Sequence, residues 1–478
     1  MRYARHFGRR TKIVCTIGPA TGSDTAIERL IKAGMDVARL NLAHGSYGEH
    51  SGYIDATRKA AQRLSIPVAI VMDLPGPKYR TGAMRTDSVV LKRGAQLTLT
   101  TKQLVGNESV VPVKYPSFTR DTEVGGTVLL GDGAIELRVQ SIRGSEVTCK
   151  VVIGGVLTAG RGIVIPGMRP AGHFVNSRLR EHIEFAIRQK PDYVAISFVS
   201  RPEDVEETRA ALHQAGRDIP IIAKIERRQA VTSFDRILAA SDGIMVARGD
   251  LGLDIPLEQV PLAQKEIIRK SNEAGKPVIT ATQMLESMIN SPRPTRAEVT
   301  DVANAIFDGT DAVMLSAETS IGKFPLAAAR MMSRVARATE HRLPYEALLT
   351  QKAAWPKLET GEMISYDACH TAHRLGAVAI VAFTQSGSTA RRVSKYRPKV
   401  PILAITPNGT VFGGLVLCWG VQPVEIAGPA SVDELFALGA RVSKELGLAK
   451  PGDLIVITGG IPLGMSGTTN LLKVHKIE

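Results

Sequence analysis

The stretch that decides the fold is residues 221–252, IIAKIERRQAVTSFDRILAASDGIMVARGDLG. It opens with a short apolar run, IIAKIE, which is typical of a strand buried on both faces. A helix-like segment follows over residues 228–240, and a second apolar run, GIMVA, then leads into Arg248, Gly249 and Asp250. This order of strand, helix and strand predicts two neighbouring strands of a parallel sheet.

Charged side chains stand at the carboxyl ends of both strands. Residues two apart on a strand share a face, so Lys224 and Glu226 point the same way. In a parallel barrel this end of the strands carries the chemistry. Carboxylates hold a hard cation and an ammonium meets phosphate oxygens, so these residues and Asp250 indicate a metal and a phosphoryl group. The alternative is a buried ion pair, which is less favourable because three such charges are costly to bury without a ligand.

Length and composition narrow the class of protein. The chain has 478 residues, which suits two to four domains. No apolar run approaches the ~20 residues that span a bilayer, and no apolar stretch follows the basic segment 1–10, so we expect a cytoplasmic protein without a membrane partner. The formal charge of +14 is spread along the chain without aromatic interleaving, which favours small anionic ligands over nucleic acid.

Cysteine and histidine give no sign of a metal centre. The four cysteines lie far apart in the sequence, so reduced, buried thiols are expected at Cys15, Cys149, Cys369 and Cys418. His370 and His373 could form a metal pair on a helix, but no third ligand is nearby in the sequence. Two histidines on the flank of a helix are the favoured interpretation.

Strands and helices alternate on both sides of residues 82–167. Counting the two strands above, apolar runs predict eight strands, within residues 11–18, 36–45, 68–82, 192–199, 221–226, 243–247, 276–284 and 311–319. Helices are expected between them, at Asp24–Ala33, Tyr47–Leu64, 178–189, 203–215, 228–240, 257–273 and 295–307. Eight is the number of a closed (β/α)8 TIM barrel. In a doubly wound open sheet, polar groups would instead cluster near one switch point.

Residues 82–167 break this rhythm. They form short alternating segments separated by Gly-Asp and Gly-Gly turns, which predicts an inserted all-β domain, a small barrel or sandwich. The hinges are expected at Thr81-Gly82 and Pro166-Gly167. Because the insertion follows the third strand, it lies over the catalytic face and suits a lid that excludes water. The alternative is that the insertion has no role in catalysis.

A second α/β unit follows the barrel. We expect the barrel over 1–81 and 168–345, a linker over 346–361 and a C-terminal α/β domain over 362–478. The loop TQSGST leads into a helix expected at 390–396, and its amides and hydroxyls make a phosphate cradle. A second loop, 459–470, is also rich in Gly, Ser and Thr. Either loop alone would be weak evidence, because Ser or Thr before a helix usually only caps the helix. Together the two loops predict an anionic effector site at Thr384, Ser386, Gly387, Ser388 and Thr389.

Several long motifs in order resemble those of pyruvate kinases. They are TKIVCTIGPAT, ARLNLAHG, AKIE, GIMVARGDLG, KPVITATQMLESM, PRPTRAEVTDVANAIFDGTDAVMLSAET and TQSGSTA. The likeness covers the barrel and the C-terminal domain, and in the insertion it is confined mostly to GDG and IPG. It implies phosphoryl transfer between phosphoenolpyruvate and ADP, giving pyruvate and ATP in the last step of glycolysis. It further implies Mg²⁺ or Mn²⁺ as cofactor, a homotetramer and activation by a phosphorylated metabolite.

The resemblance also implies roles for single residues. Lys224 stabilises the phosphoryl transition state and the enolate, and Arg39 grips the phosphoryl group. Glu226 and Asp250 are the metal ligands. The substrate carboxylate is bound by the amides of Gly249 and Asp250 and the hydroxyl of Thr282. The nucleotide contacts are Asn41, His44, Arg80 and Arg161. Enolate protonation occurs near Ser316 and Glu318. Such a transfer needs positive charge and positioning rather than covalent help.

One departure concerns potassium. Many pyruvate kinases bind K⁺ with an asparagine, a serine, an aspartate and a threonine. Here Asn41 and Asp73 remain, but Ala43 and Leu74 replace the other two oxygen donors. The family's glutamate in the following turn is Lys78, whose ammonium is a compact monovalent charge. We therefore predict that Lys78 beside Asp73 replaces K⁺, as in similar family members that are potassium-independent; a surface lysine is the alternative.

Other interpretations stay open at this point. Pro75 stands where many relatives have lysine, and the residues give no reason for it. A metal-dependent (β/α)8 lyase acting on pyruvate or phosphoenolpyruvate is the alternative enzyme, although it would not need the insertion or the C-terminal domain. A basic nucleic-acid-binding protein is the non-enzymatic alternative. The effector could be a sugar monophosphate, a bisphosphate or AMP.

Overall fold

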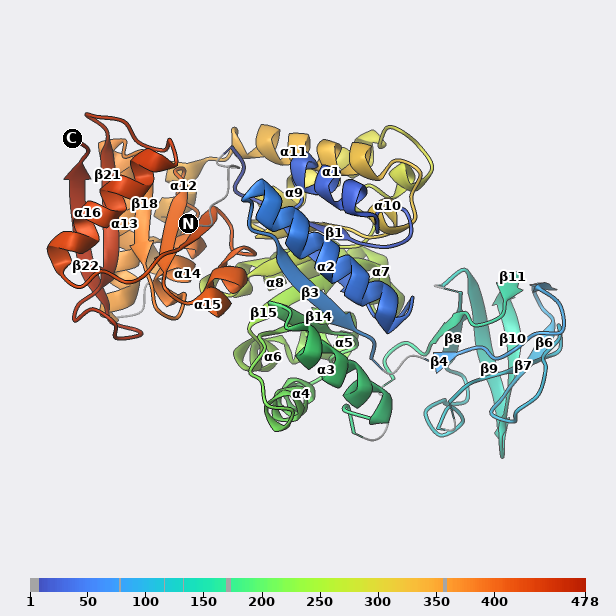
Figure 1. Ribbon diagram of the computed structural model, residues 1–478. Helices are drawn as coiled ribbons and strands as arrows, with labels where there is room; N and C mark the ends of the chain where they lie inside the picture. The colour runs from blue at the N-terminus through green and yellow to red at the C-terminus, as the bar shows by residue number, and fades with distance from the viewer. Residues whose placement is uncertain (1–7, 77–78, 116, 132, 169–172, 356–358) are drawn as a thin grey trace.

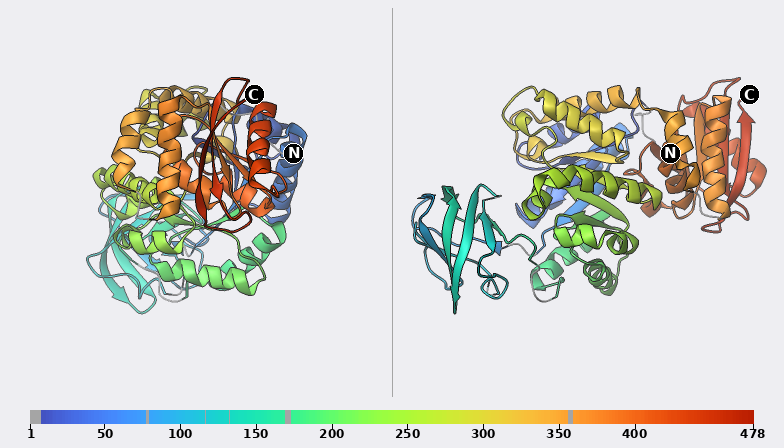
Figure 2. Two further views of the ribbon diagram at one scale, coloured as in Figure 1. Left: turned by 90° about the vertical axis from the view of Figure 1, so that its left-hand side faces the viewer. Right: turned by 180° about the vertical axis from the view of Figure 1, so that it is seen from behind.

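The computed structural model describes residues 8–76, 79–115, 117–131, 133–168, 173–355 and 359–478. Three bodies lie in a row (Figure 1): a barrel in the middle, an all-β domain on one side and an α/β domain on the other. The same row is seen from behind in Figure 2. The predicted fold class, a (β/α)8 barrel with an all-β insertion and a C-terminal α/β domain, is confirmed.

Eight parallel strands close the central barrel in the order β1-β17-β16-β15-β14-β13-β3-β2. They are β1 (Lys12–Thr16), β2 (Val37–Asn41), β3 (Ala69–Leu74), β13 (Tyr193–Ile196), β14 (Ile221–Ile225), β15 (Gly243–Ala247), β16 (Val278–Ala281) and β17 (Ala312–Leu315). Each strand is almost wholly buried, as expected when helices cover one face and side chains fill the other. All eight fall within the runs that the sequence predicts.

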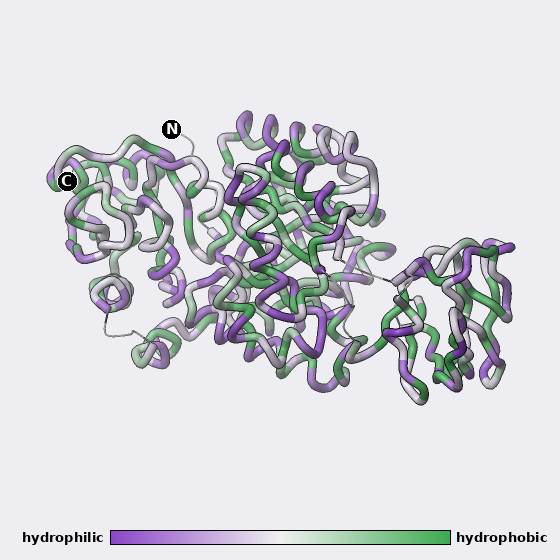
Figure 3. Tube along the Cα trace, turned by 90° about the horizontal axis from the view of Figure 1, so that it is seen from below, coloured by the Kyte–Doolittle hydropathy of each residue, from purple (hydrophilic) through white to green (hydrophobic). Residues whose placement is uncertain are grey.

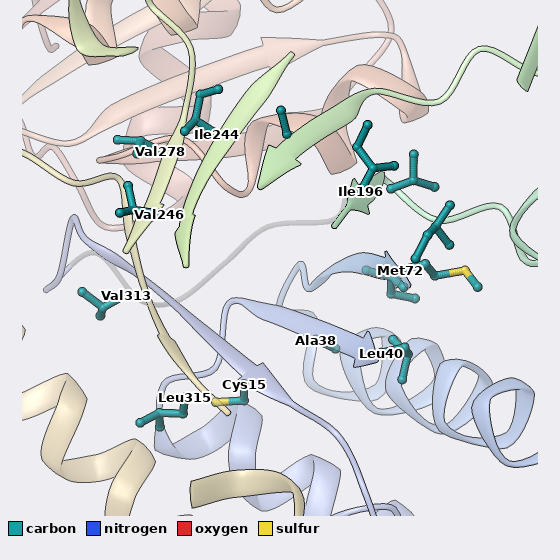
Figure 4. Close-up of a cluster of buried hydrophobic side chains, with 14 of the residues drawn as sticks. Cys15, Ala38, Leu40, Met72, Ile196, Ile244, Val246, Val278, Val313 and Leu315 are labelled. Carbon is teal, nitrogen blue, oxygen red and sulfur yellow. The ribbon is translucent and has the colours of Figure 1, made fainter. Parts of the chain in front are cut away.

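Alternation along the strands separates two layers of core. Figure 4 shows outward-facing residues such as Ala38, Met72 and Val246, which pack under the helices. Residues of the opposite parity, such as Val37, Val71 and Ile222, fill the barrel interior. The hydropathy tube in Figure 3 shows apolar segments running through the middle of each domain. Because the functional residues continue the inward parity, they point to the mouth of the barrel.

Helices cover the barrel from outside. They are α1 (Asp24–Ala33), α2 (Tyr47–Leu64), α3 (Ser177–Gln189), α4 (Pro202–Gln214), α5 (Arg228–Thr232), α6 (Phe234–Ala240), α8 (Val260–Glu273), α9 (Arg296–Phe307) and α11 (Pro325–Glu340). Among them, α2 and α9 begin with a capping box, made by Ser46 with Glu49 and by Thr295 with Glu298. Such boxes satisfy amides that the first turn leaves unpaired.

Two helical predictions need correction. The helix expected over 228–240 is broken at Ser233, whose backbone (φ −101°, ψ 15°) ends α5 and begins α6. The helix expected over 257–273 opens with a separate 3₁₀ turn at Leu257–Gln259, and Pro261 then stands in the first turn of α8, where its missing N–H costs nothing. Arg248-Gly249-Asp250 directly follows β15, as expected, and it also forms the first turn of a short helix, α7 (Arg248–Asp254).

The insertion is an all-β domain with its own core. Its strands are β4 (Tyr79–Arg80), β5 (Ser88–Leu91), β6 (Gln96–Thr100), β7 (Val110–Pro112), β8 (Thr127–Leu130), β9 (Ile135–Arg143), β10 (Glu146–Ile153), β11 (Gly155–Thr158) and β12 (Gly162–Val164). Seven of them form one sheet, and β11 pairs with β5. The core includes Leu97, Phe118 and Leu137.

A carboxylate ties the insertion to the barrel at its return. Asp254, the last residue of α7, accepts hydrogen bonds from Gly167 N (2.7 Å) and Arg228 N (2.6 Å). Arg227 Nη1 also donates to Met168 O at 2.7 Å. The return connection of the insertion is therefore attached to α7, which carries Asp250 at its other end.

The C-terminal domain has one five-stranded sheet in the order β20-β19-β18-β21-β22, in which β21 and β22 alone are antiparallel. The strands are β18 (Ala379–Phe383), β19 (Ile402–Thr406), β20 (Val421–Glu425), β21 (Leu454–Gly460) and β22 (Thr469–Lys476). The helices are α12 (Tyr345–Gln351), α13 (Thr360–Leu375), α14 (Ser388–Lys395), α15 (Gly409–Leu415) and α16 (Val432–Glu445). The helix expected at 390–396 thus begins earlier, at Ser388, inside the loop.

The C-terminal domain packs against the amino ends of the barrel strands. Arg397 Nη2 lies 2.9 Å from Asp311 Oδ2, just before β17. Tyr193 at the start of β13 donates its hydroxyl to Gly414 O at 2.7 Å. Val416 and Leu417 join the apolar core inside the barrel. The carboxyl ends of the strands are left facing the opposite way, toward the insertion (Figure 1).

Two further expectations can be compared with this structure. All four cysteines are buried with free thiols, as predicted. Across the described ranges, we find no helix that combines the length and the apolar character needed to cross a membrane.

Candidate active site

A cleft of about 540 Å³ opens at the carboxyl ends of the barrel strands. It brings together residues from four strand ends, from α7 and from the insertion. They are Arg39, Asn41, Ala43, His44, Pro75, Gly76, Arg80, Lys114, Tyr115, Asn176, Arg178, Ser197, Phe198, Lys224, Glu226 and Asp250. Most of the residues that the sequence nominates in the barrel therefore face one space.

Asp73 is the centre of a buried ion cluster at the floor of this cleft. Its Oδ2 accepts from Arg39 Nε (2.8 Å) and lies 2.7 Å from Arg39 Nη2. Its Oδ1 accepts from Ser197 Oγ and from Lys224 Nζ, both at 3.3 Å. Burial alone would raise the pKa of Asp73, but Lys224 and Arg39 hold that pKa below its usual value. Asp73 is therefore ionised and orients both cations.

Lys224 is held on three sides by oxygen atoms. Its Nζ lies 3.0 Å from Glu226 Oε1, 2.8 Å from Ser197 Oγ and 3.3 Å from Asp73 Oδ1. Burial would lower the pKa of Lys224, but Asp73 and Glu226 raise it above the usual value. The ammonium is thus a fixed positive charge, 8% exposed, at the edge of the cleft.

Glu226 and Asp250 are the two carboxylates on the cleft wall that could hold a cation. Glu226 Oε2 accepts a 2.6 Å hydrogen bond from Phe198 N, which orients the side chain. Burial raises the pKa of Glu226, Lys224 opposes this rise, and the charge of Asp250 adds to it. A divalent cation between the two carboxylates would remove that repulsion. No set of three or more His, Cys, Asp or Glu that could hold a metal gathers in the described ranges. Mg²⁺ fits a pair of carboxylates, because it binds one or two of them plus substrate phosphates and water.

A strained turn places Thr282 next to α7. Thr282 has φ +67°, a conformation that is costly for a β-branched residue, and Gln283 follows with φ +56°. Thr282 Oγ1 accepts from Gly249 N at 2.8 Å. Arg248 holds the turn through Nη2 to Thr282 O (2.8 Å) and is itself paired with Asp301 at 2.7 Å. Thr282 and Gly249 are therefore brought together, beside rather than among the residues that line the cleft.

Ser316 and Glu318 lie just after β17, at the start of the short helix α10 (Ala317–Ser320). Glu318 is 2% exposed and accepts from Ser316 N at 2.7 Å and from Leu285 N at 3.1 Å. Burial raises the pKa of Glu318 in spite of these hydrogen bonds. The hydroxyl of Ser316 is buried and has no hydrogen-bond partner in the part of the chain that the structure describes.

The predicted nucleotide residues are only partly brought together. Asn41, His44 and Arg80 line the cleft, but Arg161 does not. The Arg161 side chain instead donates from Nε to Thr158 Oγ1 at 2.7 Å, within the insertion.

Two cations that sequence reasoning missed, Lys114 and Arg178, add positive charge to the cleft. Asn176, the N-cap of α3, was also missed, although an Asn before a helix at a barrel mouth is a readable signal. No local signal marks Lys114, because only the placement of the insertion brings it there.

The proposed potassium substitute cannot be compared with the structure, because Lys78 lies outside the described residues. Its neighbours are described. Ala43 lines the cleft, and Leu74 is fully buried at the end of β3. Neither side chain carries an oxygen, so the set around Asp73 is poorer in cation ligands than the family pattern.

A second pocket, of about 320 Å³, lies in the C-terminal domain. Of the predicted effector residues, Thr384, Ser388 and Thr389 line it, whereas Ser386 and Gly387 do not. Thr384 Oγ1 is buried without a hydrogen-bond partner in the described ranges. None of the described residues that line the pocket is charged. The loop 459–470 contributes Gly460 and most of its following residues, which agrees with the pairing of the two loops predicted from sequence.

Comparison with known proteins decides the family. Residues 8–329 match the family model described as pyruvate kinase, barrel domain, and residues 362–475 match pyruvate kinase, alpha/beta domain. The chain belongs to the pyruvate kinase family. Pyruvate kinases of Staphylococcus aureus strains MRSA252 and USA300 are each 45% identical over 471 residues, which cover 98% of this chain and 80% of theirs. A crystal structure of a pyruvate kinase from Cryptosporidium parvum aligns with a TM-score of 0.93 at 37% identity, covering 98% and 97% of the two chains.

As a pyruvate kinase, the protein is a phosphotransferase of glycolysis that acts on phosphoenolpyruvate and ADP. The charge distribution in the cleft suits that reaction, since a migrating phosphoryl group needs cations on its oxygens. The match over both family domains also argues against the lyase alternative, which would not need the insertion or the C-terminal domain.

Proposed function

We propose that this enzyme transfers the phosphoryl group of phosphoenolpyruvate to ADP with Mg²⁺, or Mn²⁺, held by Glu226 and Asp250, and without K⁺. The observation that carries the proposal is the Lys224 ammonium, fixed within 3.3 Å of Asp73, Ser197 and Glu226 at the mouth of the barrel. The positive charge of Lys224 stabilises the negative charge on the phosphoryl oxygens while the phosphoryl group leaves the enol oxygen and is transferred to ADP.

Arg39 and Lys224 act as a pair on the phosphoryl group and the enolate. Both are bound by Asp73, so neither needs to reorganise when charge develops in the transition state. The metal, when bound, neutralises phosphoryl and enolate oxygens. Thr282 orients the substrate carboxylate through its hydroxyl, together with the amides of Gly249 and Asp250 at the start of α7.

The nucleotide lies toward the insertion in this proposal. Asn41, His44 and Arg80 are on the cleft wall, and Arg161 joins them when the insertion closes as a lid. The attachment of Gly167 to Asp254 supplies a hinge for that closure. Proton delivery to the enolate comes from the side of Ser316 and Glu318 through water, which the raised pKa of Glu318 supports.

Potassium independence rests on the charge of Lys78. With Asp73 already bound to Arg39 and Lys224, and with Ala43 and Leu74 in place of oxygen donors, a K⁺ ion would find few ligands. A lysine ammonium beside Asp73 supplies the same single charge without needing those oxygens.

The C-terminal pocket is the proposed effector site, within a proposed homotetramer. Thr384, Ser386, Gly387, Ser388 and Thr389 contribute hydroxyls and the amides at the start of α14, which suit one phosphate group. Because none of the described lining residues is charged, a ligand with one phosphate is favoured over a bisphosphate. Sugar monophosphates and AMP both meet that requirement.

The test of the proposed catalysis is ATP formation from phosphoenolpyruvate and ADP, coupled to lactate dehydrogenase, in buffers free of sodium and potassium. We expect full dependence on Mg²⁺ or Mn²⁺ and little change on adding K⁺. Strong activation by K⁺ would overturn the role of Lys78, and activity without a divalent cation would overturn the roles of Glu226 and Asp250.

A further inference from the structure

A third cavity, of about 330 Å³, lies at the seam between the barrel and the C-terminal domain. It is separate from the cleft and from the effector pocket, with which it shares no lining residue. Its walls come from α8, α9, α12 and the loops that follow α14 and α15. They are Arg269, Asn272, Ile306, Phe307, Asp308, Gly309, Leu343, Leu348, Gln351, Lys352, Trp355, Arg397 and Trp419.

Lys352 brings a poorly compensated charge into this cavity. Its side chain is 7% exposed, and its Nζ donates one hydrogen bond, to Lys395 O at 2.7 Å. It also lies 4.9 Å from the centre of the Trp355 ring. No carboxylate in the described ranges forms an ion pair with it. An ammonium has three donors, so two of them have no protein acceptor among the described residues.

Arg397 adds a second buried cation with an unused donor. Its Nη1 and Nη2 are taken by Asp311, Asn272 and Gly309. Its Nε is buried and has no partner among the residues described. The guanidinium also lies over Trp419, 5.3 Å from the ring centre. Burial and the neighbouring Arg397 push the pKa of Lys352 well below its ordinary value, as expected when two cations share a dry space.

The physical question is what offsets the charge of Lys352, since Asp311 already pairs with Arg397. A buried charge without a partner is costly, and a cavity of this size has room for the missing counter-charge. The rest of the wall is mixed: Ile306, Leu343, Leu348 and the two indoles form its apolar part, and Arg269, Asn272, Asp308 and Gln351 are polar. Asp308 already forms an ion pair with Lys265 and accepts a hydrogen bond from Gln264, so it does not neutralise Lys352.

We propose that this seam cavity binds a small molecule with one anionic group, a phosphate or a carboxylate, and an apolar part. The anion accepts a hydrogen bond from Lys352 Nζ and lies beside the guanidinium of Arg397, and the apolar part rests against Leu348 and Trp355. Such a ligand would touch the Arg397–Asp311 pair that joins the C-terminal domain to the start of β17. The proposal does not depend on the effector pocket.

Ligand binding in this cavity can be followed by the intrinsic fluorescence of tryptophan. The chain has two tryptophans, Trp355 and Trp419, and both line this cavity. Phenyl phosphate and benzoate, titrated separately into the full-length enzyme, should give a saturable change in tryptophan fluorescence. Benzyl alcohol, which lacks the charge, should not. The tighter of the two anions identifies the preferred acidic group.

Substitutions then locate the anion. Lys352→Met should weaken binding about 10-fold or more, the size expected for a charge-assisted hydrogen bond. Lys352→Arg should bind nearly as the parent does, and Lys102→Met, the same change at an exposed lysine of the insertion, should have no effect. The signal should persist in Ser388→Ala and Lys224→Met, because neither the effector pocket nor the cleft is involved.

A second variant keeps the test valid if Lys352→Met does not fold. Leu348→Phe narrows the cavity without changing a charge, and it should weaken phenyl phosphate binding several-fold. Circular dichroism checks that each variant is folded. The proposal is overturned if neither anion gives a saturable signal with the parent enzyme. It is equally overturned if Leu348→Phe, or a folded Lys352→Met, binds the anions as the parent does.

Discussion

The cleft and the pocket in the C-terminal domain both suit phosphate, yet they are built from different chemistry. The cleft collects buried cations and carboxylates, with Arg39, Asp73, Lys224 and Glu226 within one network. The C-terminal pocket offers hydroxyls and backbone amides, with no charged residue on its described walls. Charge is needed where a phosphoryl group moves and its charge redistributes. Neutral donors are enough where a phosphate is only bound and released.

The two regions also differ in how the backbone is held. Around the cleft, three residues other than glycine, Phe198, Thr282 and Gln283, have positive φ. In the two loops beside the C-terminal pocket, the positive φ angles fall on glycines, namely Gly387, Gly464 and Gly467. Strain of this kind persists only where surrounding contacts enforce it, as Arg248 does at Thr282. The backbone conformation around the cleft is thus more tightly held by its contacts than the backbone conformation around the C-terminal pocket.

The largest difference between the two regions should come from removing a proposed metal ligand. Glu226→Gln keeps the shape of the side chain but removes its charge, so we expect the Mg²⁺ concentration for half-maximal activity to rise by more than the ~10–100-fold that outer-shell changes cost. Activity against Mg²⁺ concentration and Mn²⁺ binding by electron paramagnetic resonance both measure this. Glu266→Gln, at an exposed helical position, is the matched control. Unchanged Mn²⁺ affinity in Glu226→Gln would refute the metal site.

A smaller effect is expected in the C-terminal pocket. Ser388→Ala removes one donor, so the activator concentration for half-maximal effect should rise about 10-fold, while the rate without activator stays the same. Activation assays below saturating phosphoenolpyruvate, with glucose 6-phosphate, AMP and fructose 1,6-bisphosphate, measure this. A bisphosphate that activates best would contradict the single-phosphate proposal. Activation that is unaltered in both Ser388→Ala and Thr389→Ala would place the effector elsewhere.

The potassium substitute should show a comparable or smaller effect. Lys78→Glu restores the family's usual residue and removes the proposed cation, so the rate without K⁺ should fall roughly 10-fold, as for one partly screened charge near the phosphate. Adding K⁺ should restore part of the lost rate, but not all of it, because the side chains of Ala43 and Leu74 have no oxygen atoms to bind K⁺. The comparison is made by assay in tetramethylammonium and potassium buffers. A rate in Lys78→Glu that is unchanged without K⁺ would show that Lys78 is a surface lysine.

The smallest effect concerns backbone strain. Gln283 is exposed with φ +56°, so Gln283→Gly relieves strain, and the free energy of unfolding should stay level or rise by up to about 1 kcal/mol. Gln62→Gly, at an exposed position inside α2, should instead lower it by about 1 kcal/mol. Thermal or denaturant unfolding compares the two. Equal destabilisation in both variants would mean that the turn is not strained.

The sequence was sufficient for the barrel and for much of the site. Buried strands are visible as apolar runs, and the two-residue period alone places Lys224 and Glu226 on a shared face at the barrel mouth. The reason is that these features are local. A strand's parity fixes which of its side chains face the same way, whatever the rest of the chain does.

What the sequence could not predict depends on distant parts of the chain. The segment of α7 contains two glycines and has low helix propensity, and it is held by Thr282 at one end and by Gly167 at the other. Lys114 reaches the cleft, and Arg161 stays outside it, only because of how the insertion sits on the barrel. The residues that line the seam cavity are spread over positions 269–419, so no local sequence motif indicates this cavity.

The most direct test of the account is the rate of ATP formation by Lys224→Met at saturating phosphoenolpyruvate, ADP and Mg²⁺. Methionine keeps the length of the side chain and removes the fixed charge, so the account predicts a loss of about 10³-fold or more, as for other groups that stabilise a phosphoryl transition state. Lys102→Met, in the insertion, should retain the parent rate. A Lys224→Met enzyme that forms ATP at close to the parent rate would contradict the central claim.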